Sequence, residues 1–244
     1  MTFKKHLPNL LTLGNLFCGT VATIFAVEGD FILVALFVVI GILFDFLDGF
    51  VARILNVTGE LGKQLDSLAD MVTSGLVPGI IMFNLLANNQ NILELNSIAS
   101  FFPYFGFILT LGACYRLAKF NIDSRQLNSF IGLPTPAMSL FVISLPLIQQ
   151  SSKIEFIQNL IANNYILFAV ALLLTYLMIS ELPLFSLKFK GYSVKNNATK
   201  YFFLVVSTVL IVFLHYVSIP LIVLFYVVLS SIITYQKRGN SNVY

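Results

Sequence analysis

The sequence predicts an all-α polytopic membrane protein, a helical bundle with about eight transmembrane helices, and three observations support this fold class. The 244-residue chain is 58% hydrophobic and only 10% charged, whereas about a quarter of the residues of an average soluble domain are charged. Its mean hydropathy is +0.90. Apolar stretches of about 18 or more residues, long enough to cross the hydrocarbon core as helices, follow one another along the chain.

Eight expected spans account for these stretches. The first follows Lys4 and Lys5 and is expected to be retained, because no small-residue cleavage site follows it cleanly. The third carries two aspartates in its first turns and is the least apolar, and only a short segment separates the last two. The expected spans are residues 10–27, 31–51, 64–87, 98–116, 133–150, 162–180, 199–215 and 217–236. No internal repeat or long linker is visible, so we expect one membrane domain over residues 1–244.

The distribution of basic residues indicates how these spans are oriented. If both termini are cytoplasmic, Lys153 is the only one of the 14 lysines and arginines that lies outside the cytoplasmic segments. Glu28 and Asp30 fall on the opposite side. Because cytoplasmic loops are enriched in lysine and arginine, we expect a multi-pass protein of the cell membrane whose termini, and the connection between spans two and three, face the cytoplasm.

Composition also limits the possible partners. The net charge is only +3 and the basic residues are dispersed, so we expect no nucleic-acid partner. The two cysteines, Cys18 and Cys114, both lie in apolar stretches and are expected to be small buried residues. They are too few for a disulfide framework or a cysteine–histidine metal cluster.

An aspartate-rich segment joins spans two and three. It contains Asp45-x2-Asp48-Gly-x2-Ala-Arg, then eight residues, then Gly-x3-Asp66-x3-Asp70. Asp45 and Asp48 share one face of a helix at spacing i, i+3, and Asp66 and Asp70 share another at i, i+4. A connection containing Gly59 and Gly62 would let the second helix return antiparallel. The four carboxylates would then converge near the cytoplasmic membrane boundary.

Four carboxylates this close together require a nearby positive charge. Oxygen ligands favour hard divalent cations, here Mg²⁺ or Mn²⁺ and also Ca²⁺, and two ions would suit a pyrophosphate substrate. Gly49 and Ala52 leave the helix surface bare beside the aspartates, and Arg53 offers a guanidinium to phosphate. The alternative is that the aspartates are helix-end residues solvated at the headgroups. Ionisable residues in membrane segments are costly and usually functional, which favours the metal site.

Two further polar regions lie on the cytoplasmic side. Asn9 and Thr12 share a face at the start of span one, where helix capping is the alternative role. Arg116 and Lys119 are cations one turn apart in the region that joins spans four and five. They could meet a phosphate or a carboxylate, or they could simply anchor the chain under the positive-inside rule. Thr135, near the expected start of span five, is available as a hydrogen-bond donor.

The run from Asp45 to Asp70 resembles the signature of the CDP-alcohol phosphatidyltransferases at every defined position. This resemblance implies that Asp70 is the general base that deprotonates the acceptor hydroxyl, with Asp66 as a second catalytic carboxylate. It implies that a pair of divalent ions is bound by Asp45, Asp48, Asp66 and Asp70. It also implies that the headgroup of the CDP-linked lipid is bound by Gly49, Ala52, Arg53 and Gly62, and its cytidine by Asn9 and Thr12.

Strings outside that segment resemble the bacterial and archaeal phosphatidylserine synthases within the family. They are G-N-x2-C-G in span one, R-L-A-K-F-N from Arg116, and F-I-G-L-P-T-P-A from Phe130. The resemblance spans about the first 140 residues. It implies CDP-diacylglycerol and L-serine as substrates in the bilayer, and a homodimer. Because no Ser–His or Cys–His pair supports a covalent intermediate, we expect direct displacement, and we expect a catalytic core over about residues 5–180. Spans 199–215 and 217–236 would be additional to that core.

Two alternatives remain at this point. The same chemistry could use glycerol 3-phosphate or inositol phosphate as the acceptor, although their extra phosphate would favour a denser basic pocket. A cation transporter is the alternative from another functional class. It would favour carboxylates near the bilayer midplane and broken-helix repeats, whereas the aspartates here are expected at the membrane boundary.

Overall fold

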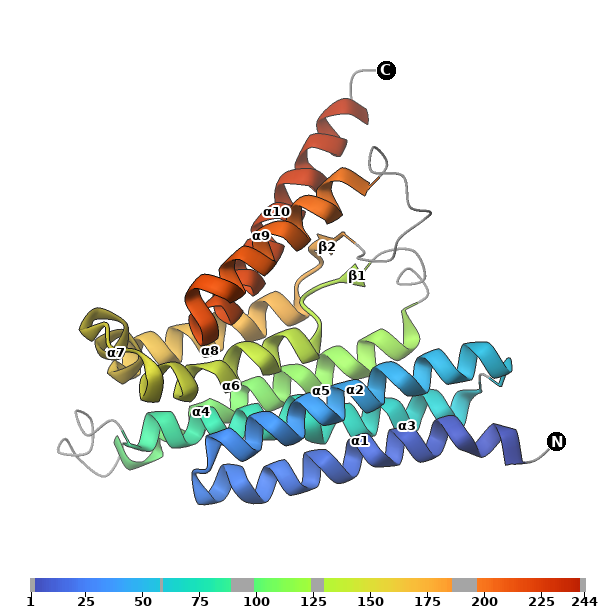
Figure 1. Ribbon diagram of the computed structural model, residues 1–244, viewed down its shortest axis with the longest axis horizontal. Coiled ribbons are helices and arrows are strands. Elements are labelled where there is room, and N and C mark those ends of the chain that lie inside the picture. Colours follow the sequence, from blue (N-terminus) through green and yellow to red (C-terminus); the bar gives the residue numbers. More distant parts are fainter. Residues whose placement is uncertain (1–2, 58, 89–98, 124–129, 186–196, 242–244) are drawn as a thin grey trace.

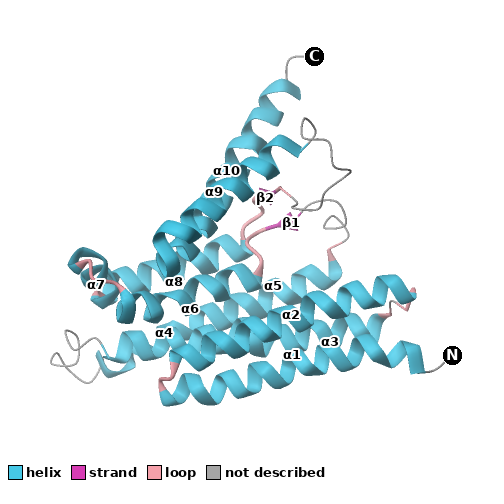
Figure 2. Ribbon diagram, viewed as in Figure 1, coloured by secondary structure: helices cyan, strands magenta, loops and turns pink. Residues whose placement is uncertain are grey.

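The computed structural model describes residues 3–57, 59–88, 99–123, 130–185 and 197–241, and nearly all of them are helical (Figures 1 and 2). The long helices up to α8 run along one direction, and α9 and α10 form a hairpin inclined to them (Figure 1). The helical elements are α1 (Phe3–Glu28), α2 (Phe31–Leu55), α3 (Glu60–Asp70), the π-helix η1 (Met71–Leu76), α4 (Val77–Asn88), the 3-10 helix η2 (Ala99–Phe107), α5 (Ile108–Ile122), α6 (Thr135–Ser151), α7 (Glu155–Ala162), α8 (Asn164–Ile179), α9 (Ala198–Leu214), the 3-10 turn η5 (His215–Val217) and α10 (Ser218–Ser241).

The predicted all-α membrane fold is confirmed, and each expected span overlaps a helix or a continuous helical stretch. Among the described residues, five stretches are long and apolar enough to cross a membrane, or six if the bent pair α7 and α8 counts as one span. The longest stretch, Ala198–Tyr235, turns back at η5 and so holds the last two expected spans. α6 has only 17 residues and lies in the core.

The packing suits a lipid environment. One large core joins buried residues of α1, α2, α4, α5, α6 and α8, including Ile81, Leu109 and Met138. Large apolar side chains are also exposed on the outer faces of the helices, for example Phe17 and Phe213. An exposed apolar surface of this kind is unfavourable in water and is expected where the solvent is lipid. These features are those of a multi-pass membrane protein.

A short connection brings α2 and α3 together. α2 begins at the cap residue Asp30, whose side chain accepts a hydrogen bond from the backbone N–H of Leu33 at 3.1 Å. It ends at Leu55, and its C-cap residue Asn56 has a left-handed backbone (φ 49°, ψ 45°). Because α3 starts at Glu60, only residues 56–59 join the helices. The expectation that Gly62 lies in the connection is wrong, since Gly62 is in the first turn of α3.

The third expected span is a continuous helical stretch that changes its winding directly after Asp70. The π-helix η1 separates α3 from α4, and such segments are frequent at functional sites. η1 lies against α1 so closely that a Cβ on Gly19 would be 2.2 Å from the hydroxyl of Thr73 and 2.9 Å from its backbone nitrogen. Glycine at position 19 therefore permits contact between the backbones of α1 and η1.

Replacing Gly19 with alanine is therefore expected to destabilise the protein. Overpacking of this kind costs about 1–3 kcal/mol, because here the new methyl group meets backbone atoms that cannot simply rotate away. The midpoint of thermal unfolding in detergent should fall. Gly14→Ala on the same helix is the matched control, since its Cβ would meet the ring of Phe44 at an ordinary 3.4 Å. Equal midpoints for the two variants would contradict the close approach at Gly19.

The helix ends beyond α4 differ from the expectation in one respect that matters for the site. Span four was expected to end at residue 116, but α5 continues to Ile122. Arg116 and Lys119 thus lie within the helix and not in the connection that follows it. Cys18 is buried as expected, whereas Cys114 on α5 is exposed, so that expectation is wrong.

A small two-stranded sheet fixes the entry into α6. β1 (Phe130–Ile131) pairs antiparallel with β2 (Pro183–Leu184), with Phe130 opposite Leu184. Gly132 follows β1 with a φ of +75°, a conformation that glycine adopts without strain. A Cβ at this position would also lie 2.4 Å from the carbonyl oxygen of Met178. This corner places Thr135 at the start of α6, facing the core.

Candidate functional site

Three of the four predicted aspartates form a compact cluster. Asp45 and Asp48 on α2 face Asp66 on α3, and one carboxylate oxygen from each lies within 4.8 Å of the other two. Asp48 is only 7% exposed, and the other two side chains are partly buried. The short connection between α2 and α3 explains the convergence, because it returns the second helix alongside the first.

This cluster fits a hard divalent cation. Oδ1 of Asp66 is buried and has no hydrogen-bond partner in the part of the chain that the structure describes. A buried acceptor without a partner is costly, and several carboxylates together repel one another unless a cation neutralises them. The donors are all oxygens, which is the set preferred by Mg²⁺, Mn²⁺ and Ca²⁺. The group could therefore bind a metal ion.

Asp70 lies beside this cluster, and a hydrogen bond from α1 orients its carboxylate. It is 9% exposed, and its Oδ1 accepts a hydrogen bond of 3.1 Å from Nδ2 of Asn15 on α1. Asn15 is itself fixed, because the hydroxyl of Thr73 in η1 donates to its backbone carbonyl at 3.1 Å. Asp70 is close enough to Asp66 to interact electrostatically, but it is not a member of the group of three.

Sequence reasoning gave Asn15 no role, although a signal for it was present. Asn9, Thr12 and Asn15 recur every three residues and so continue along one face of α1. The structure places all three against the aspartate-bearing helices. The hydroxyl of Thr12 donates to Oδ2 of Asp48, and the side chain of Asn9 lies beside Gly62 on α3.

Capping of the first helix does not explain these residues. α1 already begins at Phe3, so Asn9 and Thr12 lie well inside the helix and cannot cap its N-terminus. The capping alternative is therefore wrong for this pair.

A pocket of about 470 Å³ lies between the ends of α1, α2 and α3, next to the aspartate cluster. No side chain would meet a Cβ built on Gly49, so the pocket is open beside Asp48. Among the predicted site residues, its lining includes Asn9, Thr12, Asp48, Gly49, Ala52, Gly62 and Asp66. Its lining also includes Gly59 of the connection and four residues that the sequence interpretation did not assign to the site, namely Pro8, Val57, Glu60 and Lys63.

Arg53 is not part of this lining. Its Nε donates a 2.8 Å hydrogen bond to the carbonyl oxygen of Gly49 on its own helix, and the side chain is exposed. Eight site residues were predicted at the start of α1 or between Asp45 and Gly62, and six of them line the pocket. The two exceptions are Arg53 and Asp45, and Asp45 lies in the adjoining aspartate cluster.

The two predicted cations on α5 point in different directions. Arg116 is 8% exposed, and its Nη1 donates to the hydroxyl of Thr135 at 3.3 Å. Its positive charge acts on Asp70 across the site. Lys119 instead forms an ion pair of 3.5 Å with Glu181 near the surface. Only Arg116 of this pair is directed toward the aspartates.

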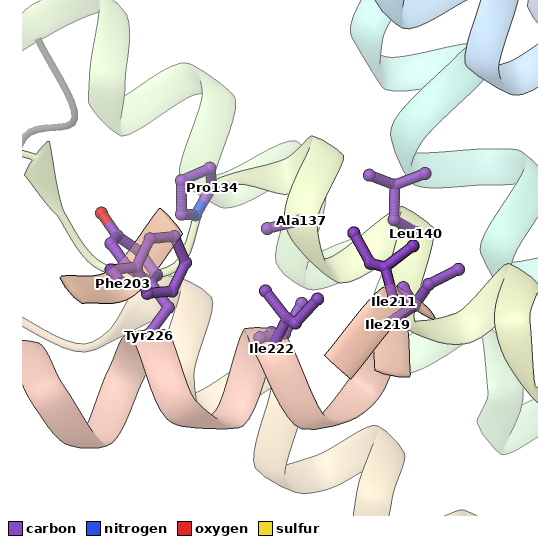
Figure 3. Close-up of a pocket in the computed structure, with 9 residues that line it drawn as sticks. Pro134, Ala137, Leu140, Phe203, Ile211, Ile219, Ile222 and Tyr226 are labelled. Atoms are coloured by element: carbon purple, nitrogen blue, oxygen red, sulfur yellow. The ribbon is translucent and has the colours of Figure 1, made fainter. Parts of the chain in front are cut away.

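A second pocket, of about 430 Å³, lies between α6 and the α9–α10 hairpin. Figure 3 shows Pro134, which precedes α6, and Leu140 of α6 on one side, with Phe203 and Ile211 of α9 and Ile222 of α10 on the other. The described residues that line it include no carboxylate and no cation. This pocket is suited to apolar groups and does not provide ligands for a metal ion or a phosphate.

The chain is similar to known proteins over most of its length. Residues 5–177 match the family model described as CDP-alcohol phosphatidyltransferase. The CDP-diacylglycerol--serine O-phosphatidyltransferase of Bacillus subtilis is 33% identical over 146 residues, which cover 58% of this chain and 75% of that protein. The Helicobacter pylori (strain ATCC 700392 / 26695) protein of the same name is 32% identical over 177 residues, 72% of this chain and 70% of that one. The archaetidylserine synthase of Methanothermobacter thermautotrophicus is 29% identical over 143 residues, 57% of this chain and 56% of that one.

Proposed function

Because this chain belongs to the CDP-alcohol phosphatidyltransferase family, we propose that it transfers the phosphatidyl group of CDP-diacylglycerol to the hydroxyl of L-serine. The products are phosphatidylserine and CMP. The observation that carries the proposal is the partly buried aspartate cluster at the edge of a polar pocket. The choice of serine is supported by the names of the relatives in Bacillus subtilis and Helicobacter pylori, both CDP-diacylglycerol--serine O-phosphatidyltransferases.

The donor is proposed to bind with its nucleotide in the pocket between α1, α2 and α3. Asn9, Thr12, Gly49, Ala52 and Gly62 line this pocket, and Gly49 and Ala52 present little side chain to obstruct a ligand. Arg53 would have to swing away from the carbonyl of Gly49 to meet a phosphate. The acyl chains remain on the lipid side of the bundle, where apolar side chains are exposed.

The aspartates are proposed to hold two divalent ions, Mg²⁺ or Mn²⁺, with Ca²⁺ as a further candidate. Asp45, Asp48 and Asp66 supply the clustered oxygens, and Asp70 adds a carboxylate at their side. Bound ions of this kind neutralise a pyrophosphate and stabilise the phosphate of the leaving group. The hydroxyl of Thr12 holds the Asp48 carboxylate in place by donating to Oδ2.

Asp70 is proposed to accept the proton of the serine hydroxyl as that oxygen attacks the phosphorus. The hydrogen bond from Asn15 occupies Oδ1, which leaves Oδ2 as the base. Asp66, one turn earlier on α3, is proposed to strengthen this base through its negative charge. The attack breaks the bond between the phosphorus and the CMP oxygen in one displacement, as in other phosphoryl transfers. Trapping a covalent phosphatidyl-enzyme in the absence of serine would contradict direct displacement.

The arrangement in the membrane is proposed from the same site. The N-terminus of α1, the end of α2 and the start of α3 lie at one end of the bundle (Figure 1). With the orientation that the basic residues favour, this end and both termini face the cytoplasm of the cell membrane. We further propose a homodimer, and a catalytic core over about residues 5–180 to which α9 and α10 are additional.

A headgroup assay tests the proposed function. Purified protein is incubated with CDP-diacylglycerol, Mg²⁺ or Mn²⁺, and radiolabelled L-serine, and CMP release and lipid labelling are measured. We expect both products in equal amounts, with little turnover on glycerol 3-phosphate. The serine assignment is wrong if glycerol 3-phosphate supports turnover and serine does not.

A further inference from the structure

Arg116 is a buried cation that has no anionic partner among the described residues. It is only 8% exposed, and no described carboxylate oxygen lies within 4.0 Å of its nitrogens. Its polar contact is with a neutral group, the hydroxyl of Thr135, and its guanidinium lies 5.2 Å from the ring centre of Phe120. Its Nε is buried and has no hydrogen-bond partner in the described part of the chain. Buried charges are normally paired, so this guanidinium is suited to receive an anion.

The position of Arg116 relative to Asp70 favours one class of anion. Its charge acts on Asp70, yet the two side chains do not form an ion pair. A ligand between them would meet a base at one end and a cation at the other. Serine carries a hydroxyl and a carboxylate joined through two carbon atoms, and so presents the matching groups in one small molecule.

The donor phosphates fit Arg116 less well. The polar pocket proposed for the nucleotide is lined by residues of α1, α2, α3 and their connection, and Arg116 does not line it. The neighbouring cation, Lys119, is engaged by Glu181, so a phosphorylated acceptor would find a single buried guanidinium here. The planar guanidinium matches a carboxylate through paired hydrogen bonds.

We propose that Arg116 binds the carboxylate of the acceptor and thereby selects serine over alcohols that lack this group. Thr135 is the residue that positions the guanidinium, because its buried hydroxyl accepts the hydrogen bond from Nη1. This inference rests on the proposed function, since it assigns the acceptor side of the same site.

The test compares L-serine with serinol, in which a hydroxymethyl group replaces the carboxylate, in wild-type protein and in Arg116→Gln. Loss of a hydrogen-bonded charge contact of this strength corresponds to about a 10- to 100-fold change in affinity. We expect the KM for serine to rise by about that factor, while the KM for CDP-diacylglycerol and the rate with serinol stay close to wild type. Arg116→Lys should recover part of the preference for serine. Lys153→Gln is the control, because it removes an exposed positive charge at the other end of the bundle.

Each outcome distinguishes this inference from the proposed function. A wild-type protein that does not use serine overturns both. A wild-type protein that uses serine, with an Arg116→Gln variant that still prefers serine to serinol, overturns the inference alone. A rise in the KM for CDP-diacylglycerol in place of that for serine assigns Arg116 to a donor phosphate and also overturns it. If Arg116→Gln does not fold, the ratio of serine to serinol turnover in Arg116→Lys decides, with an unchanged ratio counting against the inference.

Discussion

Replacing Asp70 with asparagine is expected to lower kcat with serine by about 10²- to 10⁴-fold, the range over which a positioned general base contributes to catalysis. Asparagine keeps the size of the side chain but cannot accept the proton of the attacking hydroxyl. Asp70 is also nearly buried and is oriented by Asn15.

The control for this variant is Glu28→Gln, which removes one acid at the opposite end of α1. Both variants are to be compared by size-exclusion profile and thermal unfolding before their rates are measured. Release of CMP is then followed at saturating CDP-diacylglycerol and serine. Near-full activity of Asp70→Asn would remove the general-base assignment and leave Asp70 with a role in metal binding only.

The helical fold and the aspartate cluster were accessible from sequence because each depends on local spacing. Long apolar stretches specify spans whatever their neighbours are, and the spacings of Asp45 with Asp48 and of Asp66 with Asp70 place each pair on one helix face. Only one further fact was needed, namely that α3 returns alongside α2. The glycine-containing connection predicted this return, although Gly62 proved to be within α3.

The roles of the cations were harder to predict because they depend on where each helix ends and on what lies opposite it. α5 continues past residue 116, so that Arg116 is enclosed by the bundle and Lys119 reaches Glu181 near the surface. Arg53 bonds to its own helix, a contact that competes with a ligand. Asn15 could have been found from its spacing after Asn9 and Thr12, but its contact with Asp70 joins residues 55 positions apart.

Removal of divalent metal is expected to abolish turnover reversibly, and Asp66→Asn is expected to raise the metal concentration required for half-maximal activity. Asp66 faces both aspartates of α2 and has a buried oxygen without a partner. Loss of residues that merely support metal ligands costs about 10- to 100-fold in affinity or activity, so loss of a direct ligand should cost at least as much. Activity is to be measured after chelation and during titration with Mg²⁺ or Mn²⁺.

A second measurement separates metal binding from catalysis. A ligand that binds only the folded protein stabilises it by about 2.7 kcal/mol at 100 times its Kd, so metal should raise the midpoint of thermal unfolding of the wild-type protein without any substrate. Asp66→Asn should lose most of this shift, whereas Glu155→Gln on α7, which removes an exposed acid far along the chain from the cluster, should retain it. Equal metal-dependent shifts in all three proteins would mean that the clustered aspartates do not bind the ion. The mutual repulsion of their carboxylates would then have to be relieved in another way.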